Sequence, residues 1–281
     1  MRALQDVPAP AKLNLFLHVT GRRPDGYHLL QSAFMLIDWC DTLHFEIRED
    51  GHISREDLGL ALPANDLIVR AARALQLATG CTLGAHIGVE KSIPAQAGLG
   101  GGSSDAATCL LALNRLWGLG LTRSALASIG LALGADVPFF IGGRNAWVEG
   151  IGEQLSPLER PQAHFLVIKP PAGLETVRIF ASEGLCRDTK PATIMDFAAD
   201  PFGFGRNDLQ PVATALCPDV QEVLSWFSAQ GLQGRMTGSG SAVFAHLTGD
   251  RVPDGFPDHW QGRRCCNLAV HPLTGWAPSD S

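Results

Sequence analysis

A glycine-rich segment between a strand-like and a helix-like stretch constrains this chain most. Residues 93–117 read IPAQAGLGGGSSDAATCLLALNRLW, and four of the five residues 98–102 are glycine. Apolar residues alternate over 83–89, which predicts a strand, and Ser103 or Ser104 is a suitable N-cap for a following helix. A strand, a glycine turn and a helix N-terminus together point several backbone N–H groups at an anion. The segment therefore predicts a phosphate-binding loop, with a flexible hinge or tight crossover as the alternative.

Two widespread phosphate-binding motifs are excluded. The Walker pattern requires Gly-Lys followed by Ser or Thr, and the chain contains no Gly-Lys dipeptide. The dinucleotide fingerprint, read from Gly98, requires glycine at position 103, where serine stands, and residues 118–121 (GLGL) lack the acidic residue expected downstream. An oxidoreductase of the dinucleotide-binding type therefore loses its main support.

The remaining pattern mixes strands with helices. Strands are expected at 11–19, 42–48, 164–169, 242–247 and 265–271, and helices at 67–78, from Thr122 to a stop at Gly134, and from Pro218. Pro138 is expected to hold Val137 in an extended conformation. A proline-containing connector at 155–163 predicts a boundary between an N-terminal lobe (1–160) and a C-terminal lobe (161–281).

Composition and charge narrow the class of protein. Of the 281 residues, 46% are hydrophobic and 18% charged, which suits a chain with a sizeable core. A net charge of -6 without a dense basic run makes nucleic acid an unexpected partner. No signal-peptide core and no apolar run of about 20 residues is found, so we expect a cytoplasmic protein with no membrane partner. The seven cysteines have no C-x-x-C spacing, which argues against a zinc site and a disulfide framework.

Three motifs give the chain a family resemblance. They are PAKLNL at 10–15, PAQAGLGGGSSDAA at 94–107 and MTGSGSAVF at 236–244. In order and spacing they resemble the GHMP family of small-molecule kinases, named for galactokinase, homoserine kinase, mevalonate kinase and phosphomevalonate kinase. The resemblance implies an α+β fold in two lobes, with a ribosomal S5 domain 2-like N-terminal lobe, a ferredoxin-like C-terminal lobe and the active site between them. The phrases DGYH and LGADVPFF are similar to members that phosphorylate a cytidine diphosphate-linked alcohol of isoprenoid biosynthesis.

The resemblance implies an ATP site. Its loop would wrap the phosphates, and two further residues would lie near the adenine pocket. The loop residues are Pro94, Ala95, Gln96, Ala97, Gly98, Leu99, Gly100, Gly101, Gly102, Ser103 and Ser104, and the adenine-side residues are Lys91 and Asp66. The family usually has asparagine where Asp66 stands and small residues where Gln96 and Ala97 stand, so the adenine contacts stay open. Mg²⁺ is implied by ATP chemistry, with unknown protein ligands; Ser104, Asp105 and Asp136 are near enough in the motifs.

Two residues are implied to act in the transfer itself. Asp136, in GADVP, matches the family's catalytic aspartate and would serve as general base for the attacking hydroxyl. Lys12 matches the lysine of the first motif and would pair with Asp136 and with the developing negative charge. As alternatives, Asp136 could merely cap a turn and Lys12 could extend to solvent.

The resemblance also implies four groups of residues that would bind the acceptor. Tyr27 and His28 of DGYH match a base-binding pair, and Phe180 would stack on the other face of the cytosine, unless it is simply a core residue. Asn14 would orient the alcohol end. The third motif would line the same side, unless it is only a tight turn; its residues are Thr237, Gly238, Ser239 and Gly240.

Two competing functions stay open. One is another GHMP-type kinase acting on homoserine, mevalonate or a sugar, against which DGYH favours an acceptor that carries a nucleobase. The other is a non-catalytic nucleotide-binding or RNA-binding module, which the acidic composition and the presence of Lys12, Asp136 and the glycine loop oppose. We expect a monomer or a weak homodimer.

Overall fold

Two β-sheets form the frame of the protein. The structure is a computed structural model that describes residues 2–159, 161–249, 253 and 255–279. The first sheet has the order β3-β4-β2-β5-β6, with β1 also paired to β2, and the second has the order β10-β7-β9-β8. The first sheet comprises β1 (Ala3–Arg22), β2 (His28–Arg48), β3 (Ile53–Asp57), β4 (Gly84–Glu90), β5 (Ala146–Glu149) and β6 (Gln154–Pro157). The second comprises β7 (His164–Lys169), β8 (Arg235–Met236), β9 (Val243–Leu247) and β10 (Gln261–Cys266).

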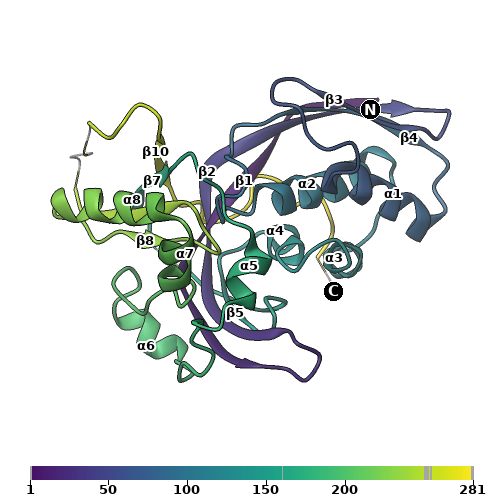
Figure 1. The fold of residues 1–281 in the computed structure, drawn as a ribbon. Helices are drawn as coiled ribbons and strands as arrows, with labels where there is room; N and C mark the ends of the chain where they lie inside the picture. Colours follow the sequence, from purple (N-terminus) through teal and green to yellow (C-terminus); the bar gives the residue numbers. More distant parts are fainter. Residues whose placement is uncertain (1, 160, 250–252, 254, 280–281) are drawn as a thin grey trace.

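Helices gather in two groups beside these sheets. In Figure 1 the first group lies beneath the long strands β1 and β2, and the second group lies beside and below the smaller sheet. The first group is α1 (Leu67–Thr79), α2 (Gly101–Leu116), α3 (Arg123–Leu131) and α4 (Val137–Gly142). The second is α5 (Thr176–Ala181), α6 (Ile194–Ala199), α7 (Gln210–Leu216) and α8 (Pro218–Ala229). No helix among the described residues is long and apolar enough to cross a membrane.

Three apolar layers hold the elements together. Ile87 of β4 and Leu110 of α2 belong to a core between the first sheet and its helices. Leu13 of β1 and Phe165 of β7 belong to a second core, in which the two sheets meet. Phe227 of α8 belongs to a third core beside the second sheet. Strand β1 contributes buried apolar residues to all three cores and so connects them.

Local sequence signals mark several helix ends, of which those at Thr122 and Pro218 were expected. The Asp66 side chain accepts a hydrogen bond from Val69 N at the start of α1, and Gly80 ends that helix with a left-handed φ of 65°. Thr122 caps α3 by accepting from Ala125 N. The expected helix from Pro218 is α8. These ends were predictable because capping depends only on neighbours in sequence.

Other local predictions were wrong. Helix α2 begins at Gly101, with Gly100 as its cap, so the two expected caps, Ser103 and Ser104, lie inside the first turn. Val137 is helical rather than extended, because Pro138 stands in the first turn of α4, where a missing N–H costs no hydrogen bond. Helix α3 ends at Leu131, before the expected stop at Gly134.

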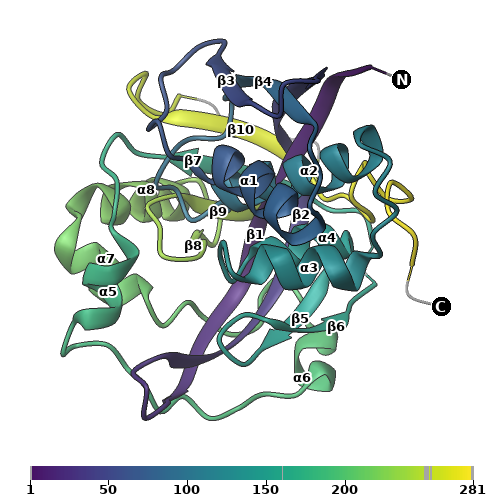
Figure 2. The same ribbon diagram turned by 90° about the vertical axis from the view of Figure 1, so that its right-hand side faces the viewer.

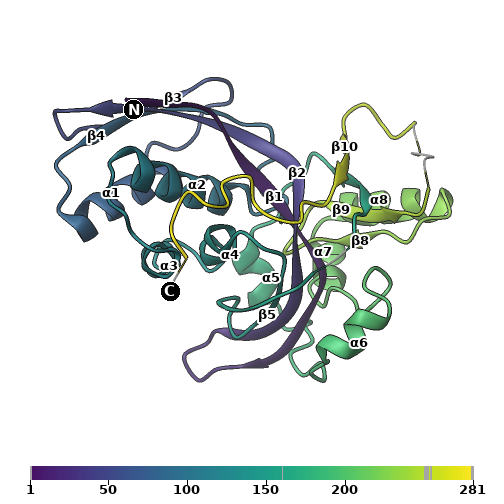
Figure 3. The same ribbon diagram turned by 180° about the vertical axis from the view of Figure 1, so that it is seen from behind.

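The last strand was expected too late in the chain. It runs over Gln261–Cys266 rather than 265–271, and pairs antiparallel with β7 at the edge of the second sheet. Its QGRRCC sequence lacks apolar alternation because an edge strand that is largely exposed has little surface to bury. The segment after it returns to the first sheet, where His271 N donates to Gly143 O and Leu273 joins the first core. Figure 3 shows this segment crossing in front of β1 and β2 towards α3.

Among the described residues, the strands of the first sheet (β1–β6) precede those of the second (β7–β10) along the chain. Figure 2 shows the long strands β1 and β2 running through the middle of the molecule, with helices of both groups on either side. A division near residue 160 is compatible with this course, and the two lobes 1–160 and 161–281 stay a prediction.

Candidate active site

A cavity of about 700 Å³ lies where the glycine loop, strand β1 and the second group of helices meet. Most of the predicted site residues line it. They are Lys12, Asn14, Asp66, Lys91, Pro94, Ala95, Gln96, Ala97, Gly98, Leu99, Gly100, Gly101, Gly102, Ser103, Asp136, Phe180, Gly238, Ser239 and Gly240. Four predicted residues do not line it, namely Ser104, Tyr27, His28 and Thr237.

The glycine loop is held from both sides. Lys12 N donates to Leu99 O at 3.0 Å, while the N–H groups of residues 241 and 242 donate to Gln96 O and Ala97 O, both at 3.1 Å. Gly98 has a φ of 72°, and a Cβ there would lie 2.1 Å from the carbonyl oxygen of Thr237. Only glycine fits this close approach of two backbones. The first and third motifs therefore fix the shape of the loop between them.

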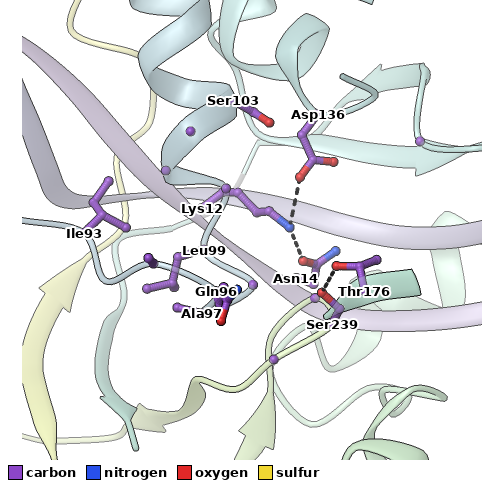
Figure 4. A pocket seen from close by; sticks show the side chains of 18 of the residues that line it. Lys12, Asn14, Ile93, Gln96, Ala97, Leu99, Ser103, Asp136, Thr176 and Ser239 are labelled. Carbon is purple, nitrogen blue, oxygen red and sulfur yellow. Dashed lines mark hydrogen bonds and ion pairs between the residues drawn. The ribbon is translucent and has the colours of Figure 1, made fainter. Parts of the chain in front are cut away.

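Lys12 and Asp136 form an ion pair inside the cavity. The Lys12 Nζ lies 3.5 Å from Asp136 Oδ2, and the lysine side chain is 4% exposed against 31% for the aspartate. The ammonium also donates to Asn14 Oδ1 and lies 4.6 Å from the centre of the Phe34 ring. Figure 4 shows Lys12 reaching from β1 to Asp136 on one side and Asn14 on the other. Lys12 does not extend to solvent, and Asp136, at the N-cap of α4, makes no side-chain capping bond.

Asn14 joins the first motif to the third. Its backbone N donates to Thr237 Oγ1 at 2.9 Å, and its Nδ2 donates to Ser32 Oγ at 2.9 Å. Thr237 is buried behind the cavity and positions Asn14 rather than lining the surface. Ser239 does reach the cavity, where its hydroxyl shares a 2.7 Å hydrogen bond with Thr176 of α5.

Lys91 is fixed by two buried carboxylates. Its Nζ lies 2.6 Å from Asp105 Oδ2 and also bonds Asp41 Oδ2. Asp41 Oδ1 accepts from the N–H groups of Ser92 (2.6 Å) and Ile93 (2.8 Å), just before the glycine loop. Burial would lower the pKa of Lys91, but the two carboxylates outweigh it and raise that pKa. Burial raises the pKa of Asp105. Asp105 is thus engaged by Lys91 through one oxygen.

On the predicted adenine side, Asp66 stands where the family usually has asparagine. Asp66 lines the cavity while capping α1 and pairing with Arg55 Nη1 at 2.9 Å. Gln96 adopts a φ of 51°, so the loop accommodates a bulky residue in a left-handed conformation. Ser104 points away from the cavity and donates to Pro10 O at 2.7 Å. Of the two serines, Ser103 is the one that faces the ligand space (Figure 4).

Of the predicted base-binding residues, Phe180 lines the cavity, whereas Tyr27 and His28 do not. The His28 and Phe180 rings are 4.9 Å apart at 31°, and Phe180 lines the cavity. Tyr27 is 61% exposed. Sequence reasoning did not find Ser32, Thr176 or Asp41, because each is brought to the site by pairing between distant segments and stands in no recognisable motif.

A cluster of metal ligands is not part of this site. Across the described ranges, no group of three or more His, Cys, Asp or Glu side chains is placed to hold a metal ion. Oxygen groups that face the phosphate end of the cavity are the Ser103 hydroxyl and the Asp136 carboxylate. Hydroxyl and carboxylate oxygens suit Mg²⁺, which keeps several waters and binds mainly through substrate phosphates.

Comparison with known proteins identifies the family. Residues 66–144 match a model described as the GHMP kinases N terminal domain, and residues 193–255 match GHMP kinases C terminal. The chain is 66% identical over 284 aligned residues to 4-diphosphocytidyl-2-C-methyl-D-erythritol kinase from Paracidovorax citrulli, with both proteins covered completely. The chain belongs to the GHMP kinase family. A protein of the same name from Variovorax paradoxus is 61% identical, covering 99% of the chain and 100% of that protein.

Solved structures of GHMP kinases share the fold. A crystal structure of 4-(cytidine 5'-diphospho)-2C-methyl-D-erythritol kinase matches with a TM-score of 0.76 and 33% identity, covering 93% of this chain and 98% of the other. Homoserine kinase from Cytophaga hutchinsonii matches with a TM-score of 0.69 over 96% of each chain, at 14% identity, which concerns the fold alone. The predicted α+β GHMP kinase fold is confirmed. As a GHMP kinase, the protein is a phosphotransferase that uses ATP and acts on an alcohol group of a small molecule.

Proposed function

We propose that this GHMP kinase transfers the γ-phosphoryl group of ATP to the 2-hydroxyl of 4-diphosphocytidyl-2-C-methyl-D-erythritol, in the methylerythritol phosphate route to isoprenoids. Full-length identity of 61–66% to kinases named for this acceptor supports the choice. The observation that carries the chemistry is the Lys12–Asp136 ion pair, which stands in one cavity with the glycine loop.

The glycine loop binds the phosphates of ATP in this proposal. Gly98, Gly100, Gly101 and Gly102 line the cavity, and the N-terminus of α2 opens onto it. Backbone N–H groups and the helix dipole stabilise the negative charge there without any side-chain rearrangement. Lys91 and Asp66 border the adenine end of the same cavity.

Asp136 acts as the base and Lys12 as the electrostatic partner. The Asp136 carboxylate takes the proton of the acceptor hydroxyl while the hydroxyl oxygen forms its bond to the γ-phosphorus and the bond to the β–γ bridging oxygen breaks. ADP leaves, and Asp136 later releases the proton to solvent. Because the charge spreads over the transferred group in the transition state, the buried Lys12 ammonium stabilises that state more than the ground state.

Mg²⁺ would be held by the Ser103 hydroxyl, the Asp136 carboxylate and the nucleotide phosphates, and would supply neutralisation of the β- and γ-phosphate charge. Asp105 is a poorer ligand because one of its oxygens already bonds Lys91. Ser104 is poorer still, since its hydroxyl is committed to Pro10 O.

The acceptor would lie across the other half of the cavity. Asn14 and Ser239 border the position of the alcohol end, and Phe180 borders the base end, with His28 beside it. Tyr27 would cover the exposed face of the cytosine, a place consistent with its exposed ring. We further propose a cytoplasmic monomer or weak homodimer with the site between lobes 1–160 and 161–281.

The proposal is tested by offering the purified protein ATP, Mg²⁺ and a panel of alcohols, and measuring ADP release. We expect phosphorylation of the cytidine-bearing acceptor, with homoserine, mevalonate and galactose at least about 100-fold poorer in kcat/KM, because their binding leaves the base end empty. Preference for an acceptor without cytidine would instead assign the protein to another GHMP activity. ATP binding without turnover on any acceptor would favour a non-catalytic module.

A further inference from the structure

Arg187 ties the His28 ring to the segment that carries Phe180. Its Nε donates to His28 Nε2 at 3.0 Å. Its Nη2 donates to the carbonyl oxygens of Phe180 (3.0 Å) and Ser182 (2.7 Å), and its Nη1 donates to Leu185 O at 3.0 Å. One guanidinium therefore holds four acceptors in fixed relation at the base end of the cavity.

The contact decides where the His28 ring carries its proton. A guanidinium has donors and no acceptor, so Nε2 of His28 must accept and cannot carry hydrogen. The ring is then neutral with its hydrogen on Nδ1. Burial, with the charges of Arg187 and of Arg22 on β1, lowers the pKa of His28 and keeps the ring neutral. Among the described residues, Nδ1 has no hydrogen-bond partner and is left as a donor for a ligand.

We propose that Arg187 is a positioning residue that makes His28 select cytosine over uracil. The ring of His28 offers an Nδ1–H donor, and cytosine presents an acceptor at N3, whereas uracil presents N3–H, which would oppose the donor. This inference rests on the proposed function, since it concerns how the base of the acceptor is read. Arg187 acts through His28 and through the Phe180 backbone rather than by touching the reacting atoms.

The geometry favours this role over a purely structural one. Three bonds to backbone carbonyls already fix the loop after α5, and they would do so with any base or none. The fourth bond goes to a ring that packs 4.9 Å from Phe180, a residue of the cavity wall. Only the bond to His28 Nε2 sets a tautomer, so its loss is expected to change the preference for cytosine over uracil.

The first experiment measures kcat/KM for the cytidine acceptor and for its uridine analogue by ADP release. In Arg187→Met, which keeps the stem and removes every donor, we expect the cytidine-to-uridine preference to fall about tenfold, the value of one hydrogen bond and its mismatch. Turnover number and KM for ATP should stay within about twofold, because the phosphate end is untouched. Arg178→Met, at an exposed arginine of α5, is the matched control and should change nothing.

Repeating the Arg187 substitution in a His28→Asn protein separates an effect on the His28 tautomer from an effect on the stability of the loop. In His28→Asn, an amide N–H takes the place of the Nδ1 donor and needs no arginine to orient its hydrogen. We expect Arg187→Met to change the base preference less than about twofold in that background, since the coupling passes through the ring. An equal loss in both backgrounds would overturn the proposal in favour of a merely structural Arg187.

Nitrogen-15 NMR of His28 reports which ring nitrogen is protonated, independently of any activity measurement. The unsubstituted protein should show Nδ1 protonated and Nε2 unprotonated at neutral pH, and Arg187→Met should shift the ring towards the Nε2–H form. An Nε2–H ring in the unsubstituted protein refutes the inference, as does an unchanged base preference in Arg187→Met. Should that variant not fold, Arg187→Lys, which cannot bond all four acceptors, is expected to lower the preference about threefold. If neither acceptor is phosphorylated by the unsubstituted protein, the proposed function fails, while the NMR result still judges the tautomer.

Discussion

Replacing Asp136 by asparagine removes the proposed base and leaves its shape. The Lys12 Nζ and Asp136 Oδ2 lie 3.5 Å apart, with 4% and 31% of the side chains exposed. At that separation two unit charges attract by about 5 kcal/mol at an effective dielectric constant of 20 and about 1 kcal/mol in bulk water. Because Asp136 is partly exposed, the interaction lies between these limits. Loss of one electrostatic partner of the transition state costs about 100-fold or more in turnover, about 2.7 kcal/mol, which falls inside that interval.

The assay is ADP release by purified Asp136→Asn at saturating ATP and acceptor. We expect kcat to fall about 100-fold or more with an unchanged unfolding temperature, because asparagine fills the same volume at the N-cap of α4. Lys12→Ala should lose turnover on the same scale. Asp50→Asn is the control, since Asp50 pairs with Arg48 at the surface and should leave kcat unaltered. A near-normal kcat in Asp136→Asn would refute the assignment of the base.

Three further outcomes follow from the packing around the site. Gly98→Ala should raise KM for ATP about tenfold and lower the free energy of unfolding more than Gly118→Ala. The reason is that a Cβ at Gly98 lies 2.1 Å from a carbonyl oxygen, whereas one at Gly118 meets no described atom within 4 Å; equal losses would contradict this. Asp41→Ala should cost about 3–5 kcal/mol in urea unfolding, because it leaves the buried ammonium of Lys91 with one carboxylate fewer, and a loss under about 1 kcal/mol would contradict it. Burial and a neighbouring arginine lower the pKa of His271 to about 4, below its unfolded value of about 6.5, so its contribution is present above pH 6.5 and lost as pH falls towards 4. Between pH 6.5 and pH 4, the unfolding free energy of His271→Gln should therefore fall less steeply than that of the unsubstituted protein, by about 1.4 kcal/mol per pH unit. Equal slopes of the two unfolding free energies against pH would exclude the effect.

Local signals predicted much of the framework. The Thr122 cap of α3 and the proline start of α8 were predicted correctly, since they depend on residues a few positions apart. The errors fell where a tertiary contact or a special backbone overrode the local preference. Helix α2 starts at Gly101 because Gly100 adopts a left-handed conformation beneath the ligand space. Strand β10 has no periodic signal because only pairing with β7 makes it a strand.

The candidate site was likewise predicted only in part from the sequence. The motifs around Lys12, Gly98 and Asp136 indicated phosphoryl transfer from sequence, because in order and spacing they resemble the motifs of the GHMP kinases. Asp41 and Arg187 were invisible, since an ion pair or hydrogen bond between residues dozens of positions apart leaves no spacing to recognise. The departure at Asp66 was noted, but its partner, Arg55, was not.

The sequence alone predicted a phosphate-binding glycine loop and membership of a kinase family, because the signals for both lie in residues close together in the chain. Only the tertiary structure decided which of Ser103 and Ser104 faces the ligand, and that the ammonium of Lys12 meets the carboxylate of Asp136. It also decided that Arg187 Nε donates to His28 Nε2, the contact from which we infer the tautomer of that ring. Those outcomes depend on distances of a few ångströms between strands, helices and loops that are remote in the chain, and only the packed sheets and cores set such distances.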